Sequence, residues 1–393
     1  MTARQRASAS AAPSGHPLTL GVEEEFILAG ADEVPAVHPE TDVFTDDGPH
    51  EPGAPEDATA LHGEMLTSMA ETATGVCTDL TQVRAQLTAA RARLSAAARA
   101  AGVQPLPLGT PPVPGPPRSA APTPHYRHMR RLYGYLVTQS ETCGCHVHVG
   151  TFDRETAVWA AGYLRPWLPT LLAISANSPF YKGVDTGYAS WRTIMLSRWP
   201  TLEIPPHFPS AAAYDETVTT LQRGGVLPSG ANAYWLVRPS YHLPTVEIRV
   251  ADTTATIDEA VLQAGLVRAL VHTALAARAD GESPPGMSDH MASAALWTAA
   301  RHGLHGPALH PFTGRQVPAV GLAEEMMAIL RPALRETGDL EEVQRLLDRV
   351  LRDGSGADRQ RRTGRRPGDA FGTAEAERRV APAAPVSADG RGG

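Results

Sequence analysis

Two histidines and two cysteines lie within six positions of the chain, in the segment CGCHVHVG of residues 143–150. The small and β-branched residues around the histidines predict a β-strand, whose side chains alternate between the two faces of a sheet. His146 and His148 then share one face, whereas Cys143 and Cys145 share the opposite face. Because a zinc ion needs converging ligands, this arrangement argues against a zinc site. A half-buried strand with hydrogen-bonded histidines is the simpler interpretation of this segment alone.

Two further segments show the same alternation. In GVEEEF, Glu23 and Glu25 project to one face, while Glu24 lies among the apolar side chains of the other face. In TVEIRV, Glu247 and Arg249 share a face, and the apolar Val246, Ile248 and Val250 lie on the opposite face. Each of these strands therefore has a polar pair on one side. This pattern predicts an antiparallel sheet with one polar face and a back that packs on helices.

The polar face that these strands predict is crowded with negative charge. Three glutamates, two histidines and one arginine on one face would repel one another strongly unless cations neutralised the carboxylates. Hard oxygen ligands indicate Mg²⁺ or Mn²⁺ rather than zinc. Mg²⁺ usually binds together with phosphates, which Arg249 can contact in a bidentate way. An ordinary solvated sheet face is the alternative that this pattern leaves open.

Composition narrows the class of protein. The chain has 393 residues, of which 42% are hydrophobic and 20% charged, as in soluble globular proteins. A net charge of −7 gives no indication of a nucleic-acid partner. Lys182 is the only lysine in the sequence, which excludes a Walker P-loop. If a nucleotide binds, arginines and metal must hold its phosphates.

Cysteine usage and hydropathy bear on the cellular location. Three cysteines in a chain of this length do not form a disulfide framework, and free thiols suit a reducing cytosol. The first residues lack the apolar region of a signal peptide, and no apolar run approaches the ~20 residues of a membrane span. We therefore expect a cytoplasmic protein without a membrane partner.

The chain divides by composition into a folded middle and two tails. Residues 1–16 are small and polar, and residues 364–393 are rich in Gly, Ala and Arg, so we predict that both are disordered. Residues 17–363 are predicted to form one domain.

Helix signals are strongest in two segments of this domain. A helix is predicted over residues 80–101, and a second over residues 257–279, which a capping box of Thr256 and Glu259 precedes. The proline-rich residues 105–125 are predicted to form a long loop. Further helices are predicted at residues 155–175, 322–336 and 340–353.

Several motifs, taken together and in order, resemble the type 2 glutamate-cysteine ligase family, whose members are also called carboxylate-amine ligases. The motifs are GVEEEF, HGEMLTSMAETATGVC, GCHVHVG, SPFYKGVDTGYASWRT, RPSYHLPTVEIRVAD and GADRQR. The resemblance runs from about residue 18 to about residue 363. It implies an α+β fold related to glutamine synthetase and the guanidino kinases, in which an antiparallel sheet backed by helices forms an open funnel over the active site. It also implies ATP-dependent joining of the γ-carboxylate of glutamate to the amine of cysteine, with Mg²⁺ or Mn²⁺.

The resemblance also implies roles for individual residues. The expected metal ligands are Glu23, Glu25, Glu64, Glu71, His146 and Glu247. Arg249 is expected to bind ATP phosphate and to act in catalysis, and Arg192 is expected to bind a substrate carboxylate. His148 or one of the carboxylates would accept the proton of the amine. Arg359 and Arg361, in the GADRQR motif, are expected to reach the nucleotide phosphates.

Some features depart from the family pattern or leave alternatives open. Glu64 and Glu71 are seven residues apart, which places them on opposite faces of a flat strand unless a bulge or break intervenes. The acidic, proline-rich residues 31–60 are unlike a fixed family element. The amine substrate stays open, as does a homodimer. A ligase that uses a different amine, a metal-dependent hydrolase and a non-catalytic metal-binding regulatory protein are the rival hypotheses.

Overall fold

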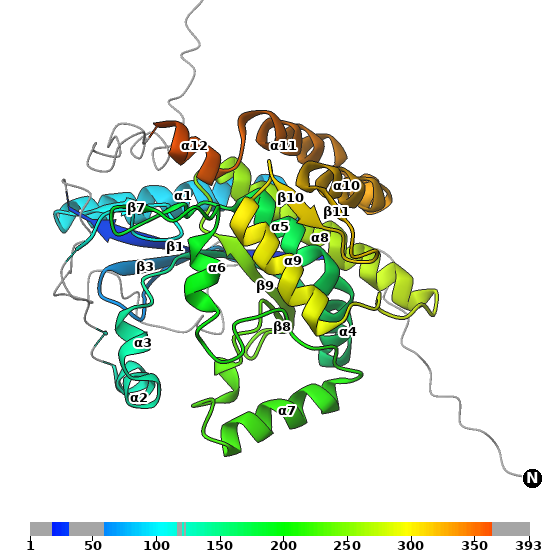
Figure 1. Cartoon of the computed structure of the whole chain (residues 1–393), viewed down its shortest axis with the longest axis horizontal. Coiled ribbons are helices and arrows are strands. Elements are labelled where there is room, and N and C mark those ends of the chain that lie inside the picture. Colours follow the sequence, from blue (N-terminus) through cyan, green and yellow to red (C-terminus); the bar gives the residue numbers. More distant parts are fainter. Residues whose placement is uncertain (1–17, 31–58, 116–119, 122, 364–393) are drawn as a thin grey trace, which may run out of the picture.

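The protein is described by a computed structural model in which an antiparallel sheet occupies the centre (Figure 1). The structure describes residues 18–30, 59–115, 120–121 and 123–363. The two predicted tails and most of the acidic segment that follows the first strand lie outside the described residues. The predicted α+β architecture is confirmed for the part of the chain described.

The central sheet has the strand order β2-β3-β1-β5-β9-β8, with β4 beside β1, and all its pairings are antiparallel. Its strands are β1 (Leu20–Ala29), β2 (Ala60–Gly63), β3 (Met69–Ala73), β4 (Gln104–Leu106), β5 (Gly144–Gly150), β8 (Val237–Pro239) and β9 (Thr245–Asp252). Two small hairpins accompany the sheet, β6–β7 (Phe180–Tyr181, Val184–Asp185) and β10–β11 (Pro307–Leu309, Gln316–Pro318).

Strand β1 organises the sheet because three strands pair with it. β3 pairs along one edge, where Glu25 lies opposite Glu71. β5 pairs with the first half of the other edge, and β4 pairs with the second half. Pro105 and Leu106 belong to β4, and Pro124 and His125 belong to α2, so the prediction that all of residues 105–125 form a loop is wrong at both ends. Proline is tolerated in β4 because a short strand at the sheet edge needs few backbone donors.

Helices cover the back of the sheet. The helices are α1 (Leu80–Ala100), α2 (Pro124–Tyr133), α3 (Tyr135–Thr138), α4 (Arg154–Leu164), α5 (Leu168–Ser175), α6 (Trp191–Leu196), α7 (Ala211–Arg223), α8 (Ile257–Ala279), α9 (Asp289–His302), α10 (Ala319–Glu336), α11 (Leu340–Asp353) and α12 (Gly356–Thr363). α1, α4, α5 and α8 pack against the sheet strands, and their apolar side chains form the main core with those of β1, β5 and β9. In Figure 1, α2 and α3 lie on the other side of β1 and β3 from α1, whereas α7 lies beyond β8 and packs on α4.

The predicted starts of α1 and α8 are confirmed. The Asp79 side chain accepts a hydrogen bond from the backbone N–H of Gln82 at the start of α1. The capping box at the start of α8 forms between Thr256 and Glu259, as predicted. α8 is long and apolar enough to cross a membrane by length and composition alone, but most of it is buried in the core of the protein. Its apolar character therefore follows from its central place among the packed helices.

Six helices in the described part of the chain were not predicted from the sequence. These are α2, α3, α6, α7, α9 and α12. α12 lies at the end of the predicted domain, and its sequence GADRQRRT has few apolar residues that could indicate a helix. Its position depends on polar contacts with other elements, which a local pattern does not reveal.

The middle glutamate of the EEE triplet in β1 belongs to the back of the sheet. Glu24 and Arg91 of α1 are both fully buried. Arg91 donates to the two carboxylate oxygens of Glu24 through Nε at 2.9 Å and Nη2 at 2.5 Å. Nη2 of Arg91 also donates to the carbonyl of Thr254 at 3.0 Å. This ion pair ties α1 to the strand that carries the polar face.

Removing one partner of this ion pair should destabilise the protein strongly. Glu24→Gln or Arg91→Met leaves a buried charge uncompensated, so we expect the free energy of unfolding to fall by about 3–5 kcal/mol. The double variant Glu24→Leu/Arg91→Met removes both charges and should recover most of that loss. Urea unfolding of the three variants measures these differences. Single variants that unfold within about 1 kcal/mol of the wild type would contradict the prediction.

Candidate active site

The central strands bring six polar side chains onto one face of the sheet. These are Glu23 and Glu25 from β1, His146 and His148 from β5, and Glu247 and Arg249 from β9. The strand register places Glu23 opposite His146, and His148 opposite Glu247. The face predicted from strand alternation is therefore assembled as expected.

A first group of possible metal ligands consists of Glu23, His148 and Glu247. One ligand atom from each lies within 4.8 Å of the others. Nε2 of His148 is 3.2 Å from Oε1 of Glu23, and it makes no hydrogen bond to any residue that the structure describes. Nδ1 of the same ring lies 2.9 Å from the hydroxyl of Thr245, which fixes the ring orientation. An oriented imidazole facing two carboxylates is a donor set that fits a divalent cation.

A second group consists of Glu25, Glu64 and Glu71, whose carboxylate oxygens also lie within 4.8 Å of one another. Glu64 directly follows β2, whereas Glu71 lies within β3. The chain reverses between these strands, which pair antiparallel. The break that the seven-residue spacing required is thus confirmed, and it brings the two carboxylates together. Three carboxylates without nitrogen ligands suit a hard cation such as Mg²⁺ or Mn²⁺.

His146 lies between the two groups. Its Nδ1 is 3.2 Å from Oε2 of Glu23, and its Nε2 is 3.9 Å from Oε1 of Glu25. Burial lowers the pKa of His146, and the nearby charge of Arg249 lowers it further. The imidazole is therefore neutral near pH 7. His148, which was named with the carboxylates as a candidate proton acceptor, is the histidine that joins Glu23 and Glu247 in the first group.

The carboxylates of this face have strongly perturbed pKa values. Burial raises the pKa of Glu71 well above its ordinary value, and the neighbouring charges of Glu23 and Glu64 raise it further. Burial likewise raises the pKa of Glu25. Burial alone would also raise the pKa of Glu23, but the adjacent His148 holds it well below the ordinary value. The second group therefore has negative charge that no cationic side chain fully offsets, and a bound cation would relieve it.

Two arginines compensate Glu247. Nε of Arg238 donates to Oε2 of Glu247 at 2.8 Å, and Nη1 of Arg249 hydrogen-bonds to Oε1. Burial would raise the pKa of Glu247, but these two guanidinium groups lower it far below its ordinary value. Nε of Arg249 has no hydrogen-bond partner among the described residues. Arg238 was missed in the sequence because β8 was not predicted, although its place opposite Glu247 is a cross-strand charge pair.

A cavity of about 320 Å³ opens beside the second group. Its charged lining comes from Glu25, Glu64, Glu71, His146, Arg192 and Arg249. Its other walls come from Met65, Met69, His125, Tyr126, Met129, Ser140, Thr142, Leu196, Trp199, Leu202, Asn232 and Tyr234. These aromatic and thioether side chains were not predicted, because they come from α2, from β3 and from loops that meet only in the folded chain.

Hydrogen bonds to the backbone of β9 fix the position of the Arg192 guanidinium group beside the cavity. Its side chain is 4% exposed, and its Nη1 and Nη2 donate to the carbonyls of Val250 and Arg249 at 3.4 and 3.3 Å. A Cβ atom at Gly144 would lie 2.2 Å from Nη2 of Arg192. Glycine is therefore required at the first position of the GCHVHVG strand, because a larger residue would displace the guanidinium group.

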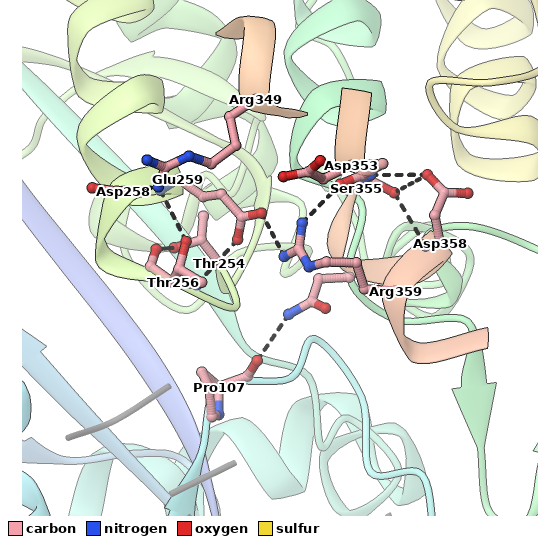
Figure 2. A network of polar contacts seen from close by, with 12 residues as sticks. Pro107, Thr254, Thr256, Asp258, Glu259, Arg349, Asp353, Ser355, Asp358 and Arg359 are labelled. Atoms are coloured by element: carbon pink, nitrogen blue, oxygen red, sulfur yellow. Dashed lines mark hydrogen bonds and ion pairs between the residues drawn. The ribbon is translucent and has the colours of Figure 1, made fainter. Parts of the chain in front are cut away.

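The structure separates Arg359 and Arg361 from the other expected site residues. Figure 2 shows Arg359 pointing toward Glu259 at the start of α8, and its Nη2 lies 2.5 Å from Oε1 of that residue. Arg361 pairs with Asp185 at 2.6 Å. Neither arginine is among the residues that line the cavity. Their contacts attach α12 to the rest of the fold.

Comparison with known proteins identifies the family. The sequence matches glutamate-cysteine ligase family 2 (GCS2) over residues 19–379. The chain belongs to this family. It is 43% identical over 345 residues to the candidate glutamate–cysteine ligase 2-2 of Saccharopolyspora erythraea, a match that covers 88% of each chain. It is also 43% identical over 353 residues to the candidate glutamate–cysteine ligase 2 of Salinispora arenicola, covering 88% of this chain and 90% of that one.

Solved structures show the same fold at low sequence identity. A bifunctional glutathione synthetase from Pasteurella multocida matches with a TM-score of 0.66 and 15% identity, over 92% of this chain and 52% of that chain, so this chain spans about half of that enzyme. A glutamate–cysteine ligase from Francisella tularensis in complex with AMP matches with a TM-score of 0.58 and 12% identity, over 93% and 92% of the two chains. The predicted fold class is confirmed, and family membership places the chain among the ligases rather than the hydrolases.

The two cysteines of the CGCHVHVG segment lie in different clusters. Cys145 is buried in the main core with Val147, as predicted. Cys143 instead packs with Ile27 and Met69, on the side of β1 that carries Glu25, so the prediction that both cysteines share one face is wrong. β5 begins only at Gly144, and its pairing with β9 is irregular after Cys145, so strand alternation does not extend back to Cys143.

The raised pKa of Glu71 makes metal binding depend on pH. Metal binding requires the ionised carboxylate, so Mn²⁺ binding should release a proton, and affinity should rise as pH increases toward the pKa of Glu71. Glu71→Gln should abolish this release and lower Mn²⁺ affinity at least about tenfold. Calorimetry in two buffers of different ionisation enthalpy measures both quantities. Glu216→Gln, on the exposed surface of α7, is the matched control. Unchanged affinity and proton release in Glu71→Gln would contradict the prediction.

Cys143 and Cys145 should be dispensable for turnover, because both are buried thiols whose pKa burial raises. We expect the double alanine variant to keep most of the wild-type turnover, whereas His146→Ala should lose nearly all of it. Turnover and metal content of the purified variants provide the measurement. A stoichiometric zinc ion that is present in the wild type and lost in the double variant would overturn this assignment.

Proposed function

We propose that this protein is an ATP-dependent carboxylate–amine ligase that joins the γ-carboxylate of glutamate to the amine of cysteine in the cytoplasm. The observation that carries the proposal is the cavity itself, in which three carboxylates face two arginines, the buried Arg192 and the partly exposed Arg249. This arrangement occurs in a member of glutamate-cysteine ligase family 2. The three free cysteines fit a reducing compartment.

The donor groups fit two divalent cations. Glu23, His148 and Glu247 would hold one ion, and Glu25, Glu64 and Glu71 would hold the second. The hard oxygen donors favour Mg²⁺ or Mn²⁺. When bound, such ions would neutralise phosphate charge. The glutamate–cysteine ligase from Francisella tularensis, which has a similar fold, was solved in complex with AMP, and this supports nucleotide binding here.

The reaction requires an activated carboxylate, because a carboxylate ion is a poor electrophile. The γ-phosphoryl group of ATP is transferred to an oxygen of the glutamate γ-carboxylate, which breaks the bond to ADP and forms an acyl phosphate. The amine nitrogen then attacks the carbonyl carbon, the amide bond forms, and inorganic phosphate leaves. Arg249 stabilises the charge on the transferred group. Arg192 binds the substrate α-carboxylate through its planar guanidinium group.

The amine must lose a proton when it attacks. His148 does not line the cavity, and its Nδ1 is engaged by Thr245. His146 does line the cavity and is neutral near pH 7, since burial and Arg249 lower its pKa. We therefore assign the proton acceptor to His146 in place of His148.

The amine substrate is less defined than the acyl donor. The cavity wall offers thioether and aromatic side chains, among them Met65, Met129 and Tyr126, and these contact small apolar groups of many kinds. Such a wall separates small side chains by only ~1–3 kcal/mol per methylene. A ligase of the same mechanism that uses another small amine is therefore the second candidate.

ADP formation should require glutamate more strictly than cysteine. A panel of acyl donors with one amine, followed by a panel of amines with one donor, tests this by coupled ADP assay. We expect glutamate to give the highest kcat/KM, with other small amines accepted at reduced rates. Glu25→Gln is the inactive control. An unrelated acyl donor with higher kcat/KM would remove glutamate as the named substrate, and ADP formation that needs no amine would contradict the ligase mechanism.

A further inference from the structure

Asp252, at the end of β9, is a fully buried carboxylate outside the proposed metal groups. Its Oδ2 accepts hydrogen bonds from the backbone N–H of Asn177 at 2.8 Å and from the hydroxyl of Ser178 at 2.7 Å. Its Oδ1 accepts from the hydroxyl of Ser190 at 2.8 Å and lies 3.8 Å from Nη1 of Arg192. One carboxylate therefore holds both ends of the segment that precedes α6.

The groups that bind Asp252 also hold the first turn of α6, which carries Arg192. The backbone N–H of Arg192 donates to the hydroxyl of Ser178 at 3.0 Å. The hydroxyl of Ser190 accepts from the backbone N–H of Thr193 at 3.3 Å and caps the helix. The direction in which Arg192 leaves the backbone therefore depends on the contacts of Asp252.

The C-terminal helix α12 contacts the same segment. Nε2 of Gln360, which is 5% exposed, donates to the carbonyl of Asn177 at 3.0 Å and to its side-chain oxygen at 2.7 Å. The side-chain amide of Asn177 in turn donates to the carbonyls of Pro107 and Thr253, both at 2.8 Å. A Cβ atom at Gly356 would lie 2.1 Å from the side-chain oxygen of Asn177, so α12 approaches Asn177 very closely.

Other contacts keep α12 in this position. Figure 2 shows Ser355 and Asp358 paired at the start of α12, where the hydroxyl of Ser355 lies 2.9 Å from Oδ2 of Asp358. Arg359 pairs with Glu259 of α8, and Arg361 pairs with Asp185 of the β6–β7 hairpin. Arg359 and Arg361, the neighbours of Gln360 in the chain, thus attach α12 to two different elements.

We propose that Gln360, Asn177 and Asp252 form a positioning relay through which α12 orients Arg192 for its substrate. None of the three lines the cavity, so they act through Arg192 and not on the substrate itself. This inference rests on the proposed function in one respect, which is that Arg192 binds the carboxylate of the acyl donor. The relay assigns the GADRQR motif a role in substrate binding without any contact to phosphate.

Gln360→Ala tests the relay, and Thr363→Ala, at an exposed position of the same helix, is the matched control. Loss of the two hydrogen bonds should raise the KM for glutamate about tenfold while the KM for ATP stays within about twofold of the wild type. Hydrogen exchange at residues 190–196 should speed up in Gln360→Ala, with β1 and β5 unchanged. Equal effects on both substrates, or faster exchange throughout the sheet, would show a general structural role and overturn the relay.

A double-mutant cycle with Arg192→Ala gives a second, independent outcome. If Gln360 acts through Arg192, Gln360→Ala should add less than about twofold to the KM for glutamate in the Arg192→Ala background. An undiminished tenfold effect in that background would overturn the relay. If the wild type forms no ADP with glutamate, the named substrate is refuted. Hydrogen exchange at residues 190–196 in Gln360→Ala then tests the relay independently, and unchanged exchange there would overturn it.

Chain truncation separates α12 from the residues that follow it. A chain that ends at Pro367 should retain the wild-type KM for glutamate. A chain that ends at Gly354 should show the same selective rise in KM and the same faster exchange at residues 190–196 as Gln360→Ala. Wild-type behaviour of the shorter chain would overturn the relay.

Discussion

Electrostatic repulsion among closely spaced carboxylates is the constraint on which the rest of this structure depends. Glu25, Glu64 and Glu71 converge within 4.8 Å, beside the first group of Glu23, His148 and Glu247. Such crowding costs free energy in a folded protein without bound cations, as the raised pKa of Glu71 reflects. The same cost becomes an advantage when divalent cations and phosphates bind, because ligands that neutralise the charge also stabilise the fold.

Strand pairing and the helical core behind the sheet stabilise β1 against this repulsion. β1 is held on both edges by hydrogen-bonded strands, and its rear side chains enter a core in which α1 and α8 are central. The buried pair of Glu24 and Arg91 attaches α1 to the same strand that carries Glu23 and Glu25. On the polar face, Arg238 and Arg249 keep Glu247 ionised. Successive residues of β1 therefore alternate between stabilising the fold, as Glu24 does, and forming the polar face, as Glu23 and Glu25 do.

The sequence predicted those parts of the site that follow from local periodicity. The pairs on β1, β5 and β9 were predictable because neighbouring strand residues must face opposite sides, whatever the strand pairs with. The helix caps at Asp79 and Thr256 are equally local. Cys143 was assigned to the wrong face because periodicity ends where the strand ends. The cavity wall, including Tyr126, was not predictable, because it is assembled from separate segments.

By itself, the sequence determined which residues have the chemistry: the carboxylates, histidines and arginines of three strands, and the family to which the chain belongs. The tertiary structure alone decided how these residues are grouped, so that His148 joins Glu23 and Glu247 while His146 lies between the groups. It also decided that Arg359 attaches a helix to α8, away from the cavity. The physical reason is that alternation along a strand is local, whereas register between strands and helix docking depend on contacts between residues far apart in the chain.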